Sequence, residues 1–481
     1  MLLARRPRTY RRREPEHSAL YQTLQQHLET FLATAAAGDP LPRFVERELR
    51  AFLKCGILAH GFARVHCGTC GFDRLVAFSC KGRGFCPSCG GKRMARLAEH
   101  LVDHVIPPVP LRQWVLTLPY RLRYRAAYDA AFARELLATF ARCLHASYRR
   151  RAREAGIASG RTGAVTFLQR FGSALNLNPH FHTQSLDGVF TEQADGSVRF
   201  HPLPPPTDAE VHAVLEDLVC RLRAVLQRHG LLEEDAFDEL GDEAPFLAGC
   251  YAGSVVQRNA IGPRAGRGPA RLGASPEPAF IEKHLRHHAQ LDGFDLHASV
   301  SVGARDHARR EQLLRYCARP PISHDRLELH PDGRIQLQLK TPWHDGTTHL
   351  LLHPDELIQR LVALIPRPHK NLVVYHGVLA PNAKWRSRVV AYGRGAEDAA
   401  VHRTGGKGDS PNRPNSEWAR LMRRAFDLDV LRCPRCGSTM RVIALIESEP
   451  VARRILRHIG LRDHAPPIAP AQTPDLDFHV A

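Results

Sequence analysis

The chain is short of lysine, of acidic residues and of long apolar runs, and each shortage limits what it can be. No apolar run approaches the roughly 18 residues that a membrane-spanning helix needs, so we expect no membrane association. The basic start, residues 1–14, has no apolar segment after it, which excludes a secretory signal peptide and favours a cytoplasmic location.

The charge balance points to a polyanionic partner. The 481 residues include 67 basic and 49 acidic ones, a net charge of +18. Eight of the basic residues are lysine and 59 are arginine, whose guanidinium can contact phosphate in a bidentate manner. A GC-rich genome would equally explain arginine in place of lysine, but it does not explain the excess over acid. Nucleic acid is therefore the expected partner.

Cysteine, by contrast, is plentiful, and its spacing predicts zinc. Twelve cysteines without a signal peptide indicate a reducing compartment and metal binding rather than disulfides. Two Cys-x-x-Cys pairs separated by fifteen residues fit a zinc pattern in which two tight turns complete one tetrahedron. A closed site of this kind is structural, because it leaves no open position for catalysis. The predicted ligands are Cys67, Cys70, Cys86 and Cys89.

Of the eight cysteines outside this predicted site, four are further candidates for metal binding. Cys55 and Cys80 are either spare thiols or alternative ligands. Cys433 and Cys436 form a lone Cys-x-x-Cys pair that is either half of a metal site, completed by partners such as His458 or His464, or a plain turn.

Two histidines flank one large apolar residue at His180-Phe181-His182. In a strand, alternate side chains point to the same face, so both imidazoles would face one side while Phe181 enters the core. Two imidazoles on one face can share a divalent cation, which can polarise a scissile phosphate. A strand–helix sequence downstream places Tyr316 near the end of a helix over residues 306–318, beside Arg315 and Arg319. From that helix alone, the simpler interpretation is that Tyr316 is a partly buried tyrosine without a catalytic role.

The periodicity predicts a mixture of helices and strands. Strands are expected over 113–118, 165–171, around 180 and over 296–302, and Asp195-Gly196 is expected to close a hairpin. Thr207 and Glu210 form a capping box before a helix. Residues 394–415 read as a linker, and Ser416 could cap the helix after it.

These motifs together resemble the rolling-circle transposases of bacterial insertion sequences, the family typified by insertion sequence ninety-one. The resemblance covers roughly residues 20–385. Its segments are 76–90 (VAFSCKGRGFCPSCG), 113–119 (QWVLTLP), 176–182 (NLNPHFH), 314–321 (LRYCARPP) and 375–382 (YHGVLAPN).

The resemblance implies an α+β fold in three parts. A zinc-binding N-terminal domain is expected over residues 15–106. An HUH nuclease domain, with a central antiparallel sheet flanked by helices and a helical insertion at about 205–290, is expected over 107–385. A linker and a mostly helical, basic C-terminal region with the lone Cys-x-x-Cys is expected over 386–481.

The resemblance also implies the chemistry. His180 and His182 would hold Mg²⁺ or Mn²⁺ on the scissile phosphate, and Tyr316 would attack it, leaving a 5′-phosphotyrosine and a free 3′-OH. Zinc would be held by the N-terminal cysteines. HUH sites usually have a third polar ligand, for which Gln169 leads and Gln312 and Gln184 are alternatives.

One position departs from the family pattern. Some relatives have two tyrosines four residues apart, and here the first of these positions holds Gln312. A single tyrosine could act twice, or two protomers could cooperate as a homodimer. Tyr375, followed by His376, is the alternative nucleophile.

The predicted function is therefore a transposase that cuts and rejoins single-stranded DNA at the ends of an insertion sequence, at the bacterial nucleoid. A replication initiator with the same chemistry is one alternative, although the chain has no P-loop of the GxxxxGK[ST] type. The other is a non-catalytic zinc-ribbon regulator, although no helix-turn-helix is evident.

Overall fold

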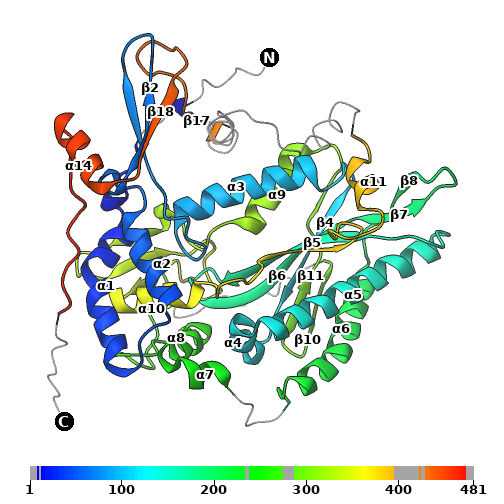
Figure 1. Cartoon of the computed structure of the whole chain (residues 1–481). Helices are drawn as coiled ribbons and strands as arrows, with labels where there is room; N and C mark the ends of the chain where they lie inside the picture. Colours follow the sequence, from blue (N-terminus) through cyan, green and yellow to red (C-terminus); the bar gives the residue numbers. More distant parts are fainter. Residues whose placement is uncertain are drawn as a thin grey trace, which may run out of the picture.

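An antiparallel sheet occupies the middle of the molecule (Figure 1). The computed structural model describes residues 8–9, 12–232, 238–274, 286–394, 422–423 and 428–472. The strands of the sheet run in the order β10-β11-β4-β6-β5-β16, and β12 pairs with β4 outside this path. Their bounds are β4 Leu111–Thr117, β5 Gly163–Phe171, β6 Leu177–Leu186, β10 His288–Leu291, β11 Phe294–His297, β12 Ser301–Val302 and β16 Val373–Gly377.

The two faces of this sheet pack against different helices. Phe181 of β6, with Trp114 and Leu116 of β4, belongs to the core formed with α5 (Ala130–Glu154) and α6 (Asp208–Arg228). The alternate residues of the same strands face α3 (Pro87–His104) and α9 (His307–Ala318), which also contact each other. Figure 1 shows these helices on opposite sides of the sheet. The face under α9 is the one that carries His180 and His182.

A second apolar core holds the N-terminal helices against a smaller sheet. In it, α1 (Ala19–Gly38) contacts both α10 (Pro354–Leu364) and β13. The small sheet has the order β13-β14-β15-β9. The remaining elements here are α2 Arg43–Lys54, α4 Tyr120–Tyr128, α7 Glu239–Glu243, α8 Pro245–Val256, β9 Ala270–Leu272, β13 Leu327–Leu329, β14 Ile335–Gln338 and β15 His349–Leu352.

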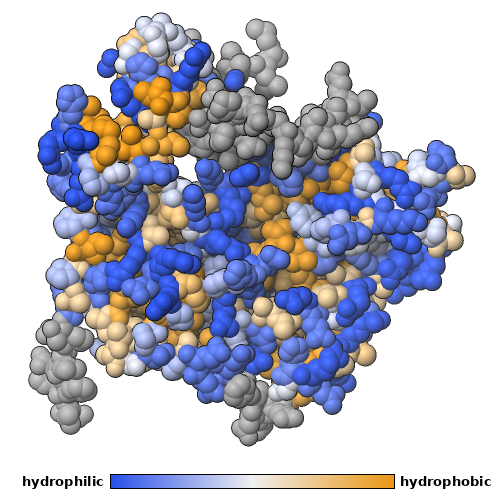
Figure 2. Space-filling model, viewed as in Figure 1, coloured by the Kyte–Doolittle hydropathy of each residue, from blue (hydrophilic) through white to orange (hydrophobic). Residues whose placement is uncertain are grey.

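The C-terminal segment returns to the N-terminal part of the chain. Strand β18 (Arg441–Ile446) pairs with β2 (Phe62–His66), which pairs with β3 (Asp73–Ala77). Helix α14 (Glu449–His458) follows and packs on Leu58 and Phe62. Figure 2 shows hydrophobic side chains gathered over this lobe and α14. The described residues also form β1 Arg8–Thr9, paired with β17 Leu428–Asp429, the hairpin of β7 Gly188–Glu192 and β8 Val198–Pro202, and α11 Arg386–Ala391. Three short 3-10 helices span Pro15–His17, Leu58–His60 and His324–Arg326.

The predicted α+β class is confirmed, with an antiparallel sheet flanked by helices. The hairpin at Gly196, the capping box of α6 and the helix ending at Ala318 also form as predicted. The strand predicted over 296–302 is interrupted, because residues 298–300 oppose only two residues of β4 and form a bulge. The C-terminal region contains a strand as well as a helix. Most of the linker predicted over 394–415, and Ser416, lie outside the described residues.

None of the helices in the described part of the chain is both long enough and apolar enough to cross a bilayer.

Candidate active site and cysteine clusters

The two histidines lie side by side on β6, with their ring nitrogens facing each other. The Nε2 atoms of His180 and His182 are 3.0 Å apart. His180 Nδ1 lies 2.7 Å from the backbone oxygen of Asn178, so Nδ1–H donates to this carbonyl and Nε2 keeps its lone pair. His182 is 4 % exposed. The strand alternation thus places both rings on the face predicted from the sequence.

Both imidazoles are neutral in the free protein at neutral pH. Burial lowers the pKa of His180 to about 4, against a smaller opposing effect of its bond to Asn178. Burial, with smaller electrostatic contributions from His180 and Arg319, holds the pKa of His182 well below its usual value. Neutral imidazoles present the lone pairs that metal binding requires.

The spacing of the nitrogens suits one divalent cation. Ligand atoms about 2.1 Å from an octahedral cation lie about 3.0 Å apart when they occupy adjacent corners. The observed separation of the Nε2 atoms is 3.0 Å. The two histidines therefore fit Mg²⁺ or Mn²⁺ as neighbouring ligands.

Gln169 lies next to this pair on the adjacent strand. It is the direct cross-strand partner of His180, and the register of β5 slips just beyond it, between Gln169 and Phe171. Its side-chain Nε2 donates to the backbone oxygens of Tyr316 (3.1 Å) and Cys317 (2.7 Å). Its Oε1 is buried and has no hydrogen-bond partner. An amide oxygen held beside two imidazoles suits a third ligand.

The alternatives to Gln169 are placed less well. Gln312 is exposed on α9. Gln184 is buried and its Nε2 donates to Gln113 Oε1 (2.9 Å), although its own Oε1 also lacks a partner. Which of the three binds a metal stays a prediction.

Tyr316 meets the histidines from the last turn of α9. Its ring packs edge-on against that of His182, with the centroids 5.7 Å apart. The side chain is 45 % exposed. The guanidinium of Arg319 lies 3.9 Å from the centre of the tyrosine ring, and the ammonium of Lys340 lies 5.3 Å from it. An exposed tyrosine whose ring lies close to two cations is suited to meet a phosphate.

A pocket of about 370 Å³ opens beside the tyrosine and His180. Three of its lining residues are cations, Arg319, Arg326 and Lys340, and none of its described lining residues is acidic. Burial, and then Arg319 and Arg326, lower the pKa of Lys340 to about 8. The sequence does not predict Arg326 and Lys340 as part of the site, because Arg326 ends a 3-10 helix just before β13 and Lys340 follows β14, and no local pattern connects either to it.

Tyr375 lies elsewhere on the sheet. It pairs with Val165 on β5, four residues from Gln169, which corresponds to about 13 Å along the strand. Its ring joins the core between the sheet, α3 and α9, where burial raises its pKa. The structure thus gathers His180, His182, Gln169 and Tyr316, and leaves Tyr375 apart.

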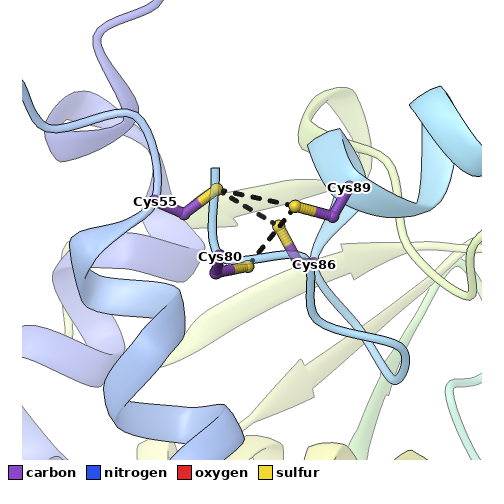
Figure 3. A group of neighbouring side chains, drawn as sticks. All are labelled: Cys55, Cys80, Cys86 and Cys89. Carbon is purple, nitrogen blue, oxygen red and sulfur yellow. Dashed lines mark hydrogen bonds between the residues drawn. The ribbon is translucent and has the colours of Figure 1, made fainter. Parts of the chain in front are cut away.

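The predicted grouping of the zinc cysteines is wrong. Cys86 and Cys89, at the start of α3, cluster with Cys55 and Cys80 (Figure 3). Three of its sulfur–sulfur distances are 3.4 to 3.8 Å, and all four sulfur atoms lie within 4.8 Å of one another. Sulfurs about 2.3 Å from a tetrahedral zinc lie about 3.8 Å apart, so the cluster fits one zinc ion.

Cys67 and Cys70 lie at the far end of the β2–β3 hairpin, in the turn between the strands. Five residues of β3 separate this turn from the first cluster, a length of about 17 Å. The turn instead meets Cys433 and Cys436, and the four sulfur atoms all lie within 4.8 Å of one another. The two N-terminal Cys-x-x-Cys pairs thus belong to different clusters.

Two family models match the chain. The model of a "Transposase zinc-binding domain" matches residues 23–118, which include Cys55, Cys80 and both predicted cysteine pairs. The model described as "Putative transposase" matches residues 163–387, which include Gln169, both histidines and Tyr316. Cys433 and Cys436 lie outside both ranges. No curated protein and no solved structure matches the chain.

Proposed function

Because this chain belongs to the transposase family typified by insertion sequence ninety-one, we propose that it cuts and rejoins single-stranded DNA at the ends of such an element through a phosphotyrosine intermediate. The observation that supports this most is the meeting of His180, His182, Gln169 and Tyr316 beside a pocket lined by cations. Each component alone is common; together they provide a nucleophile, a cation site and a phosphate site.

Tyr316 is the proposed nucleophile. Its Oη attacks the scissile phosphorus, the bond from phosphorus to the 3′ oxygen breaks, and the DNA is left with a free 3′-OH and a 5′-phosphate joined to the tyrosine. The phenol proton is lost to solvent and the departing 3′ oxygen gains one. A later attack by a 3′-OH on the phosphotyrosine reverses these bonds and rejoins a strand without an external energy source.

His180 and His182, with Gln169 as the proposed third ligand, would hold Mg²⁺ or Mn²⁺, which supplies polarisation of the scissile phosphate. The protein's own cations act on the same group. Arg319 and Lys340 lie over the tyrosine ring and can hold the non-bridging oxygens close to the attacking Oη. Edge-on packing against His182 restrains the tyrosine ring.

The pocket is also suited to single-stranded substrate. Trp343 lines it together with Arg326 and offers an indole ring on which an unpaired base can stack. Duplex bases are not free to stack in this way, which supports DNA ends presented as single strands.

A single nucleophilic tyrosine per chain limits how two strands are exchanged. Gln312, one turn before Tyr316, has no hydroxyl, so a second nucleophile must come from another round of Tyr316 chemistry or from a second protomer. A homodimer is one of these two arrangements.

A covalent-adduct assay tests the proposal. Full-length protein would be mixed with labelled single-stranded oligonucleotides from the ends of its own element, with Mn²⁺, Mg²⁺ or chelator. We expect a denaturation-resistant protein–DNA band that requires the metal, is lost in Tyr316→Phe and persists in Tyr375→Phe, the matched control. Tight DNA binding without a band under any metal would instead favour the regulator. Cleavage only at plasmid-type origins would favour a replication initiator.

A further inference from the structure

We infer that Cys67, Cys70, Cys433 and Cys436 bind a second zinc ion, which clasps the C-terminal segment onto the β2–β3 hairpin and is released before the ion of the Cys55 cluster. Neither matched family range contains all four residues, and the proposed DNA chemistry does not use them.

The two halves of this site have the same backbone geometry. In the N-terminal half, Gly71 N–H donates to Cys67 O (2.9 Å), and Cys67 N–H donates to the oxygen of the residue five positions on. In the C-terminal half, Gly437 N–H donates to Cys433 O (3.0 Å), and Cys433 N–H donates to the oxygen of the residue five positions on. Both glycines have positive φ, +71° and +77°, which a residue with a Cβ rarely adopts. Two equal turns that present two sulfurs each are how paired knuckles build a tetrahedral zinc site.

The sulfur distances agree with a shared ion. Cys67 Sγ lies 3.5 Å from Cys436 Sγ, and Cys70 Sγ lies 3.5 Å from Cys433 Sγ. Disulfide sulfurs are about 2.05 Å apart, whereas zinc ligands are about 3.8 Å apart, so the spacing is that of ligands. Each contact crosses from one half to the other, as a shared ion requires.

The C-terminal segment that this ion would hold is far in sequence from the β2–β3 hairpin. Cys70 and Cys433 are 363 positions apart. Arg74 of β3 donates to the backbone oxygens of Val430 (2.5 Å) and Arg432 (3.1 Å). The hairpin therefore also binds the chain directly before Cys433. Arg435 of the knuckle lines a groove of about 930 Å³ between β3 and α14. The ion would therefore fix both the C-terminal segment and the shape of this groove.

The two clusters differ in exposure. Cys55, Cys86 and Cys89 are buried and Cys80 is half-buried, within the core formed by α1, α2 and α10. In the other cluster, Cys70 and Cys436 are exposed. A chelator or an alkylating reagent reaches exposed thiolates first, so the ion bound by the cluster with Cys70 and Cys436 is expected to leave first.

Zinc stoichiometry and release test the inference on the full-length protein. We expect two zinc ions per chain, released by a chelator in a fast and a slow phase. The double variant Cys433→Ser/Cys436→Ser should contain one ion and keep only the slow phase, and this remaining ion shows that the rest of the chain has folded. The single variant Cys436→His, which keeps a zinc ligand at this exposed position, should keep the fast phase. Cys220→Ser, an exposed cysteine outside both clusters, is the matched control and should keep both.

A cobalt-substituted sample adds a spectroscopic readout. The ligand-field absorption of tetrahedral thiolate cobalt should fall by about half in Cys433→Ser/Cys436→Ser and stay unchanged in Cys220→Ser. One ion per chain in the native protein, or two ions in the double serine variant, would overturn the inference. Because neither readout uses DNA, this result does not depend on whether the proposed strand cleavage occurs.

Discussion

The histidine–tyrosine site and the cysteine clusters both gather metal-binding side chains, but they differ in what completes the set. Each cluster has four sulfur atoms of one kind from the protein itself, which closes a tetrahedron. The His180–His182 pair offers two nitrogens and one nearby amide oxygen, next to a pocket of about 370 Å³. A closed set holds the fold, whereas an open set leaves positions for a substrate. The two kinds of site should therefore respond differently to the same perturbation.

The largest difference between the responses of the two kinds of site is expected from His180→Ala. Metal-dependent strand cleavage should fall roughly 10³-fold, because charge stabilisation by a bound cation is worth several kcal/mol. Zinc content, unfolding temperature and DNA affinity should stay close to those of the native chain. His201→Ala, on the β7–β8 hairpin away from the site, serves as the control. If His180→Ala cleaves at the native rate, the histidine pair is not the metal site.

The converse change is Cys89→Ser in the buried cluster. It should remove one zinc ion and lower the free energy of unfolding by about 4 kcal/mol, since loss of a structural metal is among the largest single-residue effects. Chemical denaturation and zinc analysis measure this. Cys250→Ser, a buried cysteine outside both clusters, should lose no zinc. Unchanged zinc content in Cys89→Ser would show that this cluster binds no ion.

A smaller effect is expected from Gln169→Ala, which tests whether Gln169 supplies a third metal ligand beside the two histidines. If its free Oε1 is the third ligand, Mn²⁺ affinity should weaken by about 10- to 100-fold. The concentration of Mn²⁺ required for half-maximal cleavage reports this change. Gln312→Ala, on the exposed side of α9, should leave it unaltered, and Gln184→Ala separates the remaining alternative. A shift with Gln312→Ala alone would reassign the ligand.

The smallest effect is the change of DNA affinity with pH, which depends on the charge of Lys340 in the pocket. The pKa of Lys340 is lowered to about 8, so its charge is present below that pH and is lost above it. Phosphate binding favours the charged form, and affinity for single-stranded DNA should therefore fall a few-fold between pH 7 and 9, as for loss of about one phosphate contact. Lys340→Arg keeps its charge over this range and should flatten the profile. A profile that is identical in both proteins would remove Lys340 from the phosphate site.

Local patterns were enough to place the histidines and the tyrosine on their strand and helix, whereas their proposed catalytic roles came from the resemblance to the transposase family. Strand alternation placed His180 and His182 on one face, and the helix ending near Ala318 was predicted from its spacing and the prolines after it. That Gln169 lies opposite His180 also follows from neighbouring antiparallel strands, β5 and β6. These residues lie close to one another in the sequence, so local sequence patterns predict their arrangement directly.

The metal grouping could not be predicted in the same way. All three Cys-x-x-Cys pairs are followed by glycine, so nothing in the local sequence distinguishes their partners. The outcome depends on β18 pairing with β2 across most of the chain and on the length of the β2–β3 hairpin. Lys340 and Arg326 were missed for a related reason, because only the packing of the small sheet brings them to Tyr316.

The most direct test is to identify the residue that carries the DNA. Native protein would react with a single-stranded oligonucleotide and Mn²⁺, the adduct would be trimmed with nuclease and protease, and the nucleotide-bearing peptide would be sequenced by mass spectrometry. We predict that the nucleotide is attached through its 5′-phosphate to Tyr316. Attachment to Tyr375 or to another tyrosine would contradict the proposal that the histidine face of the sheet is the active site.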